Sequence, residues 1–117
     1  ILYNIGYNKE VNGMIFSINT GLLEACVLAL LKDSDSYGYK LTQDVKSLLP
    51  ISESTLYPVL KRLQTSGYLE TYDRPIDGRN RKYYKITPAG LRQHELYIGE
   101  WKSYKELIDK IFKGTAL

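Results

Sequence analysis

The sequence predicts a mostly helical α+β fold, and three features of the chain support this prediction. Two amphipathic segments, residues 37–49 and 53–66, follow each other with only a short turn between them. Two Tyr-rich segments with the character of strands, residues 68–74 and 81–87, then flank a basic turn. The last segment, residues 88–113, carries an apolar repeat of the heptad type. This order is that of a winged helix-turn-helix followed by a long C-terminal dimerisation helix.

The length and the charge distribution fit one small domain with a phosphate-bearing partner. The chain has 117 residues, with 16 Lys and Arg against 13 Asp and Glu. Residues 37–92 hold ten of the basic and five of the acidic residues, so positive charge is concentrated there. We therefore expect a DNA-binding domain at 19–87 and a dimerisation helix at 88–113, with an N-terminal arm at 1–18 and a tail at 114–117.

The composition argues against several classes of site. A single cysteine, Cys26, and a single histidine, His94, allow neither a disulfide within the chain nor a Cys/His metal cluster. Nucleophile and phosphate-loop motifs are absent from the sequence, so we expect no enzyme activity, no metal and no cofactor. The longest apolar run, residues 25–31, is too short to span a membrane, and no secretory signal is visible. We therefore expect a cytoplasmic protein without a membrane partner.

The N-terminal part combines an irregular arm with a very apolar helix. Met14 is a candidate native start, in which case the preceding residues are upstream or vector-derived. Residues 19–32 are apolar almost all round the predicted helix, and such a helix must be buried. Because a small domain has little room for it, we expect part of this helix to pack against a second subunit. The interface residues predicted here are Leu22, Leu23, Val27 and Leu30.

Residues 53–66 form the predicted reading helix. Its core-facing side chains recur at the spacing of one helix face, at Leu56, Val59, Leu60 and Leu63. Ser52 or Ser54 can cap its N-terminus and Gly67 ends it, whereas Pro58 fits only near the first turn or at a bend. The opposite face is either merely solvated or a DNA-reading surface. On the second interpretation, the groove and phosphate contacts are Ser54, Thr55, Tyr57, Lys61 and Arg62.

The two strand segments form a hairpin with a basic tip. Pro75, Asp77 and Gly78 predict the turn, and residues 74–85 hold five basic residues against one acid. The predicted contacts to phosphate or to the minor groove are Arg79, Asn80, Arg81 and Lys82, with a solvated charged turn as the alternative. Neighbouring residues of a strand point to opposite faces. One of Tyr83 and Tyr84 is therefore expected in the core and the other against a phosphate. The pattern does not say which, and Tyr83 is included among the predicted contacts.

The last helix is expected to join two copies of the chain. Thr87 caps it, Pro88 occupies its first position and Gly114 ends it. Its apolar seam has spacings of 4, 3, 4 and 3, at Tyr97, Trp101, Tyr104, Ile108 and Ile111. One small domain cannot cover a seam of this length, so we predict a homodimer.

Trp101 is also a candidate for binding a small molecule. Its flat ring, with Tyr97 and Ile98 beside it, suits an aromatic or cationic effector. The alternative is that Trp101 only packs in the core of the dimer, as seam aromatics commonly do.

Three blocks of the sequence resemble the PadR family of bacterial transcriptional regulators. They are YGY at 37–39; STLYPVLKRL at 54–63 with GYL at 67–69; and GR at 78–79 with RKYY at 81–84 and ITPAG at 86–90. The resemblance covers about residues 21–112 and is to the short subgroup, which has a single long C-terminal helix. It implies a dimeric winged-helix regulator. It also places Trp101 where a multidrug-responsive repressor of that subgroup stacks flat drugs on a Trp.

The expected function is that of a DNA-binding transcriptional regulator. Tyr39 and Lys40 complete the predicted set of contacts to double-stranded DNA. We expect a repressor that acts as a dimer on a pseudo-palindromic operator and is released by a small aromatic ligand at the dimer interface. The alternative is a winged-helix module that uses the same surfaces for protein partners and does not bind DNA.

Overall fold

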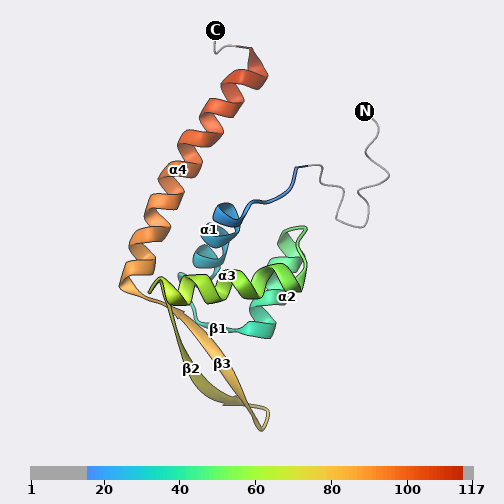
Figure 1. Ribbon diagram of the computed structural model, residues 1–117, viewed down its shortest axis with the longest axis vertical. Coiled ribbons are helices and arrows are strands. Elements are labelled where there is room, and N and C mark those ends of the chain that lie inside the picture. Colours follow the sequence, from blue (N-terminus) through green and yellow to red (C-terminus); the bar gives the residue numbers. More distant parts are fainter. Residues whose placement is uncertain (1–15, 115–117) are drawn as a thin grey trace, which may run out of the picture.

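The computed structural model describes residues 16–114, and these form four helices and a three-stranded sheet (Figure 1). In chain order the elements are α1 (Thr20–Leu31), β1 (Ser36–Tyr37), α2 (Gly38–Leu48), α3 (Glu53–Thr65), β2 (Leu69–Ile76), β3 (Arg79–Ile86) and α4 (Pro88–Lys113). The predicted fold class, mostly helical with a winged helix-turn-helix, is confirmed. The expectations for the arm before residue 16, including the start at Met14, and for residues 115–117 lie outside the described residues.

One apolar core lies between α1, α2, α3 and the sheet. Its buried side chains are Leu23, Val27, Leu28, Leu31, Leu41, Val45, Leu56, Val59, Leu60, Leu63, Leu69, Tyr84 and Ile86. The interface prediction is therefore wrong for Leu23 and Val27, which are fully buried within their own subunit. Because α1 is apolar on every side, its sequence pattern does not distinguish the core face from the outer face. Leu22 and Leu30 remain partly exposed.

The ends of α3 determine how the chain enters the hairpin. Ser52 occupies the N-cap position, although its hydroxyl makes no cap hydrogen bond to the helix backbone. Pro58 lies inside the helix, beyond the first turn. At the other end Gly67 has a φ of +82°, and the N–H of Tyr68 donates to the carbonyl of Leu63 at 2.9 Å. This is a Schellman ending, for which glycine is the favoured residue.

The sheet has the strand order β1-β3-β2 and is antiparallel throughout. β1 was not predicted, because two residues are too few to show a strand pattern. Asp77 and Gly78 alone form the hairpin turn, with φ of +52° and +75°, as a type I′ turn requires. The predicted turn was too long, since Pro75 lies within β2 opposite Asn80. Proline is tolerated there because β2 is at the edge of the sheet.

The joint between β3 and α4 is closely packed. The Thr87 hydroxyl accepts a hydrogen bond from the N–H of Gly90 at 3.0 Å and donates to the carbonyl of Gly67 at 2.6 Å. The N–H of Thr87 donates to the carbonyl of Tyr68 at 3.1 Å. The start of α4 is thereby bonded to the segment that follows α3, so the direction of α4 is tied to that of the helix-turn-helix.

α4 and the hairpin project from the core in opposite directions (Figure 1). The radius of gyration is 16.8 Å, whereas a compact domain of about 100 residues has roughly 13 Å. α4 ends as predicted at Gly114, which has a left-handed conformation. Its C-terminal half stands clear of the other described elements and is solvent-exposed along most of its length.

Candidate nucleic-acid interface

The outward face of α3 presents short polar side chains and one lysine. Ser54, Thr55 and Lys61 are exposed. Tyr57 is partly covered because it lies against the start of α2, where a side chain on Gly38 would meet the Tyr57 ring at 3.6 Å. The Tyr57 ring thus packs closely against the backbone at the start of α2. Of the predicted α3 contacts, Ser54, Thr55 and Lys61 are therefore accessible and Tyr57 is accessible in part. The hydroxyls of Ser54 and Thr55 share hydrogen bonds with that of Ser52, at 3.0 and 2.9 Å.

Arg62 is engaged within its own subunit. Its Nε lies 2.9 Å from one carboxylate oxygen of Glu24 on α1, while the Tyr97 hydroxyl on α4 donates to the other oxygen at 3.1 Å. Burial chiefly raises the pKa of the Tyr97 phenol above its ordinary value, so it remains a protonated donor at neutral pH. Arg62 remains 48% exposed despite this pair, so its predicted phosphate contact stays a prediction, although Glu24 offsets part of its charge. Glu24 also links the reading helix to α4.

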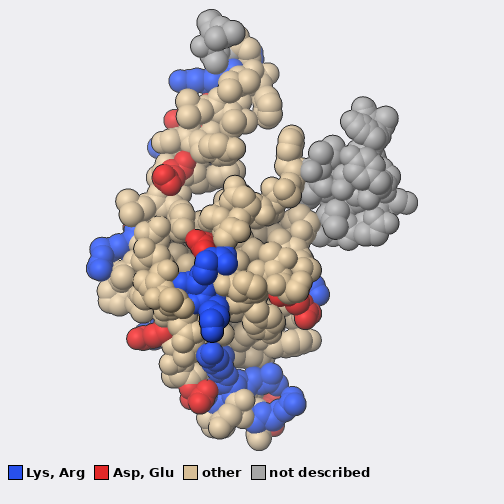
Figure 2. Space-filling model, viewed as in Figure 1, with Lys and Arg blue, Asp and Glu red and all other residues tan. Residues whose placement is uncertain are grey.

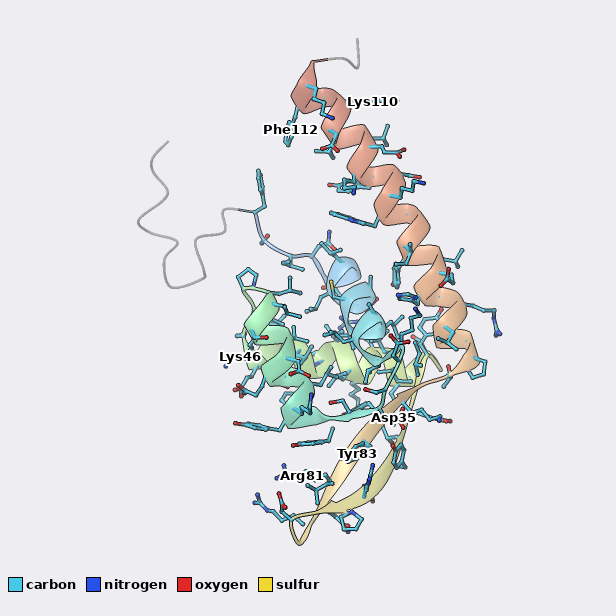
Figure 3. All side chains as sticks on the ribbon, turned by 180° about the vertical axis from the view of Figure 1, so that it is seen from behind. Asp35, Lys46, Arg81, Tyr83, Lys110 and Phe112 are labelled. Atoms are coloured by element: carbon cyan, nitrogen blue, oxygen red, sulfur yellow. The ribbon has the colours of Figure 1, made fainter. Side chains whose placement is uncertain are left out.

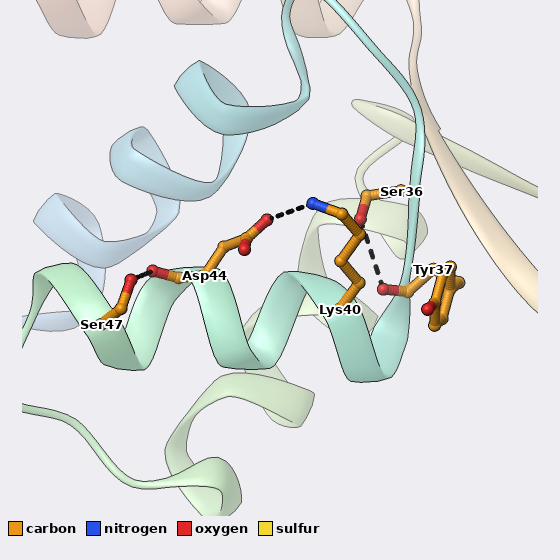
Figure 4. A network of polar contacts seen from close by, with 5 residues as sticks. All are labelled: Ser36, Tyr37, Lys40, Asp44 and Ser47. Atoms are coloured by element: carbon orange, nitrogen blue, oxygen red, sulfur yellow. Dashed lines mark hydrogen bonds and ion pairs between the residues drawn. The ribbon is translucent and has the colours of Figure 1, made fainter.

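The basic residues of α2 are also paired. Lys40 lies 2.9 Å from Asp44, one helical turn away (Figure 4). The hydrogen bond to Asp44 is the main cause that raises the pKa of Lys40. Lys46 pairs with Glu53 at the start of α3 at 3.3 Å. Tyr39 is exposed, but Lys40 brings little uncompensated charge to its surroundings.

The basic residues of the hairpin contrast with these. Among the described residues, none of the five has an acidic partner within ion-pair distance: Arg74, Arg79, Arg81, Lys82 and Lys85. The register places Arg79 and Arg81 on one face of the hairpin and Asn80 and Lys82 on the other. Figure 2 shows Lys and Arg atoms in a column that runs from the face where α3 lies down to the hairpin tip. Asp73 and Glu70 lie directly opposite Lys82 and Lys85 in the register, so the least compensated charge on the projecting hairpin is that of its arginines.

The two tyrosines of β3 point to opposite faces of the sheet, and one of them lies in the core, as predicted. Tyr84 packs in the core. Tyr83 lies on the opposite face of the sheet between Tyr37 and Tyr72, with ring centroids 5.4 and 5.5 Å away, and is labelled in Figure 3. Arg74 lies over the Tyr83 ring. Only 8% of Tyr83 is exposed, so its prediction as a DNA contact is corrected.

A groove of about 340 Å³ lies between the start of α1 and α4. Its lining residues are Asn19, Gly21, Leu22, Ala25, Tyr97, Glu100, Trp101 and Tyr104. The Trp101 and Tyr104 rings are 6.2 Å apart and tilted. Two of the three residues predicted for an effector site, Trp101 and Tyr97, line this groove, whereas Ile98 lies outside the lining and is solvent-exposed.

The outer part of α4 exposes large apolar side chains. Those that are largely solvent-exposed in the single subunit are Leu96, Ile98, Trp101, Tyr104, Leu107, Ile111 and Phe112. Ile108 is half-buried. Figure 3 shows Phe112 at the far end of the helix, away from the core. Exposed apolar surface of this length is typical of interaction sites.

The model of the transcriptional regulator PadR-like family matches residues 27–96. The chain belongs to this family. Over 99 residues it is 35% identical to an uncharacterized protein of Lysinibacillus sphaericus, covering 80% of this chain and 91% of the relative.

Solved structures resemble this PadR-like chain over most of its length. The smu.1704 structure from Streptococcus mutans has 41% identity and a TM-score of 0.82, covering 89% of this chain and 98% of that one. A PadR family transcriptional regulator from Eggerthella lenta has 30% identity and a TM-score of 0.75, covering 92% and 96%. None of the helices in the described range is long and apolar enough to cross a membrane.

Three residues that take part in the contacts described above were not selected from the sequence of this PadR-like regulator. Glu24 is the one acidic residue of the otherwise apolar helix α1. This contrast is the feature of the sequence that could have pointed to it. Arg74 was counted among the basic residues of the hairpin but not selected. The Asp77-Gly78 pair fixes a two-residue turn and thus a register in which Arg74 lies opposite Arg81. Tyr37 had no comparable signal, because β1 itself was not predicted.

Proposed function

We propose that this PadR-like regulator is a dimeric repressor that binds a pseudo-palindromic operator through α3 and the hairpin of each subunit. The observation that carries the proposal is the concentration on the hairpin of basic residues without an ion-pair partner. Lys40, Lys46 and Arg62 each have a carboxylate partner, whereas Lys61 and the five basic residues of the hairpin have none among the described residues. Phosphates would supply the missing negative charge, and counterion release would favour their binding.

The shape of the subunit supports the same assignment. A major groove about 12 Å wide admits one helix, and α3 presents Ser54, Thr55 and Lys61 outward. The hairpin extends beyond the core, where its arginines can reach the backbone or the minor groove. Short polar side chains then read base edges, while the basic ones hold the protein on the duplex.

Dimerisation through α4 provides the second half-site contact. The exposed apolar side chains of α4 have no cover in the described part of the subunit. A second copy related by a twofold axis would cover the same surface on both chains. Two reading helices would then face one duplex, which matches an operator with twofold symmetry.

The groove beside Trp101 is the proposed effector site. Its aromatic rings suit a flat ligand, and Glu100 in the lining favours a cationic one. Because the groove involves α4, an occupant would act on the angle between two subunits. Release from DNA follows only if the ligand binds one dimer geometry more tightly than the other.

Replacing Arg81 with alanine is expected to weaken binding to the DNA upstream of the gene by about tenfold and to lower the salt slope by about one. The loss should be similar for all duplex sequences, because a phosphate contact carries no base information. Fluorescence anisotropy across a salt series measures both quantities. The control is Lys102→Ala, which removes the same charge from α4. Unchanged affinity of the Arg81 variant would remove the hairpin from the mechanism and favour the protein-interaction alternative.

Trp101 is the only tryptophan of the chain, so its fluorescence reports directly on the groove. Planar aromatic cations are expected to quench it with a saturable titration and, at the same concentrations, to weaken DNA binding. An aliphatic amine of equal charge serves as the control. If no planar cation quenches the fluorescence, the effector site is not at Trp101.

A further inference from the structure

The outer face of the sheet, opposite the core, carries a row of three tyrosines, one from each strand. Tyr37 on β1 and Tyr72 on β2 both lie directly beside Tyr83 on β3. The ring centroids are 5.4 Å apart for the first pair and 5.5 Å for the second. The Tyr72 hydroxyl donates to Asp35 at 2.6 Å. The hydrogen bond to Asp35 therefore holds Tyr72 at the end of the row, and ring packing holds Tyr83 between Tyr72 and Tyr37.

Two arginines lie on the same face of the sheet, each two residues nearer the hairpin turn than the tyrosine of its own strand. Arg74 and Arg81 are directly opposite each other on β2 and β3. Each leans diagonally over the tyrosine of the neighbouring strand. The Cζ of Arg81 lies 4.9 Å from the ring centroid of Tyr37, and the Cζ of Arg74 lies 5.4 Å from that of Tyr83. The two guanidinium groups thus lie over neighbouring tyrosine rings, and both arginine side chains lean across the sheet toward β1.

This arrangement concentrates charge that the subunit does not neutralise. Like charges directly opposite each other on neighbouring strands repel. The ring faces of Tyr37 and Tyr83 offset part of this repulsion, because an aromatic face attracts a cation. Among the described residues no carboxylate pairs with Arg74 or Arg81. The Nε of Arg81 is buried without a hydrogen-bond partner in the same part of the chain.

We propose that Arg74 and Arg81 form a two-armed clamp for one phosphate of the DNA backbone, and that Tyr37 and Tyr83 are its positioning residues. The inference rests on the proposed function, since the phosphate is that of the operator duplex. Guanidinium groups present several N–H donors in a fixed plane that matches phosphate oxygens. Tyr37 and Tyr83 hold these planes in place before DNA arrives, so less side-chain freedom is lost on binding. Tyr83 therefore acts through Arg74.

The first test compares Arg74→Ala with the wild type by anisotropy on the duplex used for Arg81. The clamp predicts a loss of about tenfold, similar to that of Arg81→Ala, together with a lower salt slope. Arg74→Lys, which keeps the charge but not the planar group, should lose several-fold while the salt slope is unchanged. If the wild type binds and Arg74→Ala binds equally well, the clamp is overturned and the proposed function stands. If the wild type itself does not bind, both are overturned.

The second test separates positioning from general stability. Tyr37→Phe keeps the ring and should bind DNA like the wild type, whereas Tyr37→Leu should bind several-fold more weakly. In the Arg81→Ala background, Tyr37→Leu should have no further effect, because the side chain that it positions is gone. An equal loss in both backgrounds would show that Tyr37 acts elsewhere and would overturn its assigned role. Circular dichroism of each variant confirms that the folded population is the same.

Discussion

A double substitution of Leu107 and Ile111 by glutamate is expected to convert the protein into a folded monomer that has lost specific DNA binding. The two side chains are 59% and 61% exposed in the single subunit. Neither belongs to the core of its own subunit, so the fold should survive the change. In a dimer through α4, the new carboxylates would be buried without partners, at a cost of several kcal/mol each. The dimer through α4 should therefore no longer form.

The loss of DNA binding follows from the loss of linkage between the two half-sites. When one subunit is bound, a linked second subunit has a high effective concentration at the neighbouring half-site. Removing the linkage lowers the overall affinity by about 10²–10⁴-fold without changing any contact to DNA. Analytical ultracentrifugation measures the mass, and anisotropy on the same samples measures the affinity.

The matched control for this prediction is Leu48→Glu. Leu48 is as exposed as the two α4 residues, but it lies at the end of α2. Its substitution introduces the same chemistry away from the proposed interface and should leave the mass unchanged. If the α4 variant remains dimeric, the interface between copies lies on another surface, and the assignment of α4 has to be abandoned.

Replacing Gly90 with alanine is expected to destabilise the subunit by about 3 kcal/mol, the upper range for overpacking a closely packed site. A Cβ on Gly90 would lie 2.2 Å from the carbonyl oxygen of Tyr68 and 2.7 Å from a side-chain carbon of Ile86. The Tyr68 carbonyl cannot move away easily, because it accepts the N–H of Thr87. A loss of this size is a large part of the 5–15 kcal/mol that typically holds a domain together.

Thermal unfolding provides the measurement. For a domain near 100 residues, 3 kcal/mol corresponds to a decrease in Tm on the order of 10 °C or more. Gly99→Ala on the same helix is the control, since a Cβ there would meet nothing within 4 Å. It should be neutral or slightly stabilising, because alanine favours a helix over glycine by roughly 0.5–1 kcal/mol. Equal stability of the Gly90 variant and the wild type would contradict the packing described for the joint between β3 and α4.

The helices were predictable because their signals are local and strong. The Thr87 cap and the endings at Gly67 and Gly114 follow from backbone groups that need a partner or a left-handed residue, whatever the rest of the fold does. The period of α3 likewise predicted its buried face correctly. These features depend only on neighbours within one turn of the chain.

The parts that were missed depend on contacts between distant segments. β1 forms because Ser36 and Tyr37 pair with the edge of β3. A segment of two residues is too short for its sequence to predict this pairing. Arg62 looked free because its partner, Glu24, lies 38 positions earlier in the chain. Tyr83 was assigned to DNA because the tyrosines that cover it come from two other strands. Which charges are compensated, and hence which surface attracts phosphate, was therefore decided by tertiary structure.

The most direct test of the account is the mass of the complex between the wild-type protein and a duplex from the region upstream of its gene. Sedimentation velocity at low salt should show two chains on each duplex, formed from a dimer that is already present without DNA. A protein that remains monomeric at micromolar concentration, or one that forms no complex with this duplex at low salt, would contradict the account.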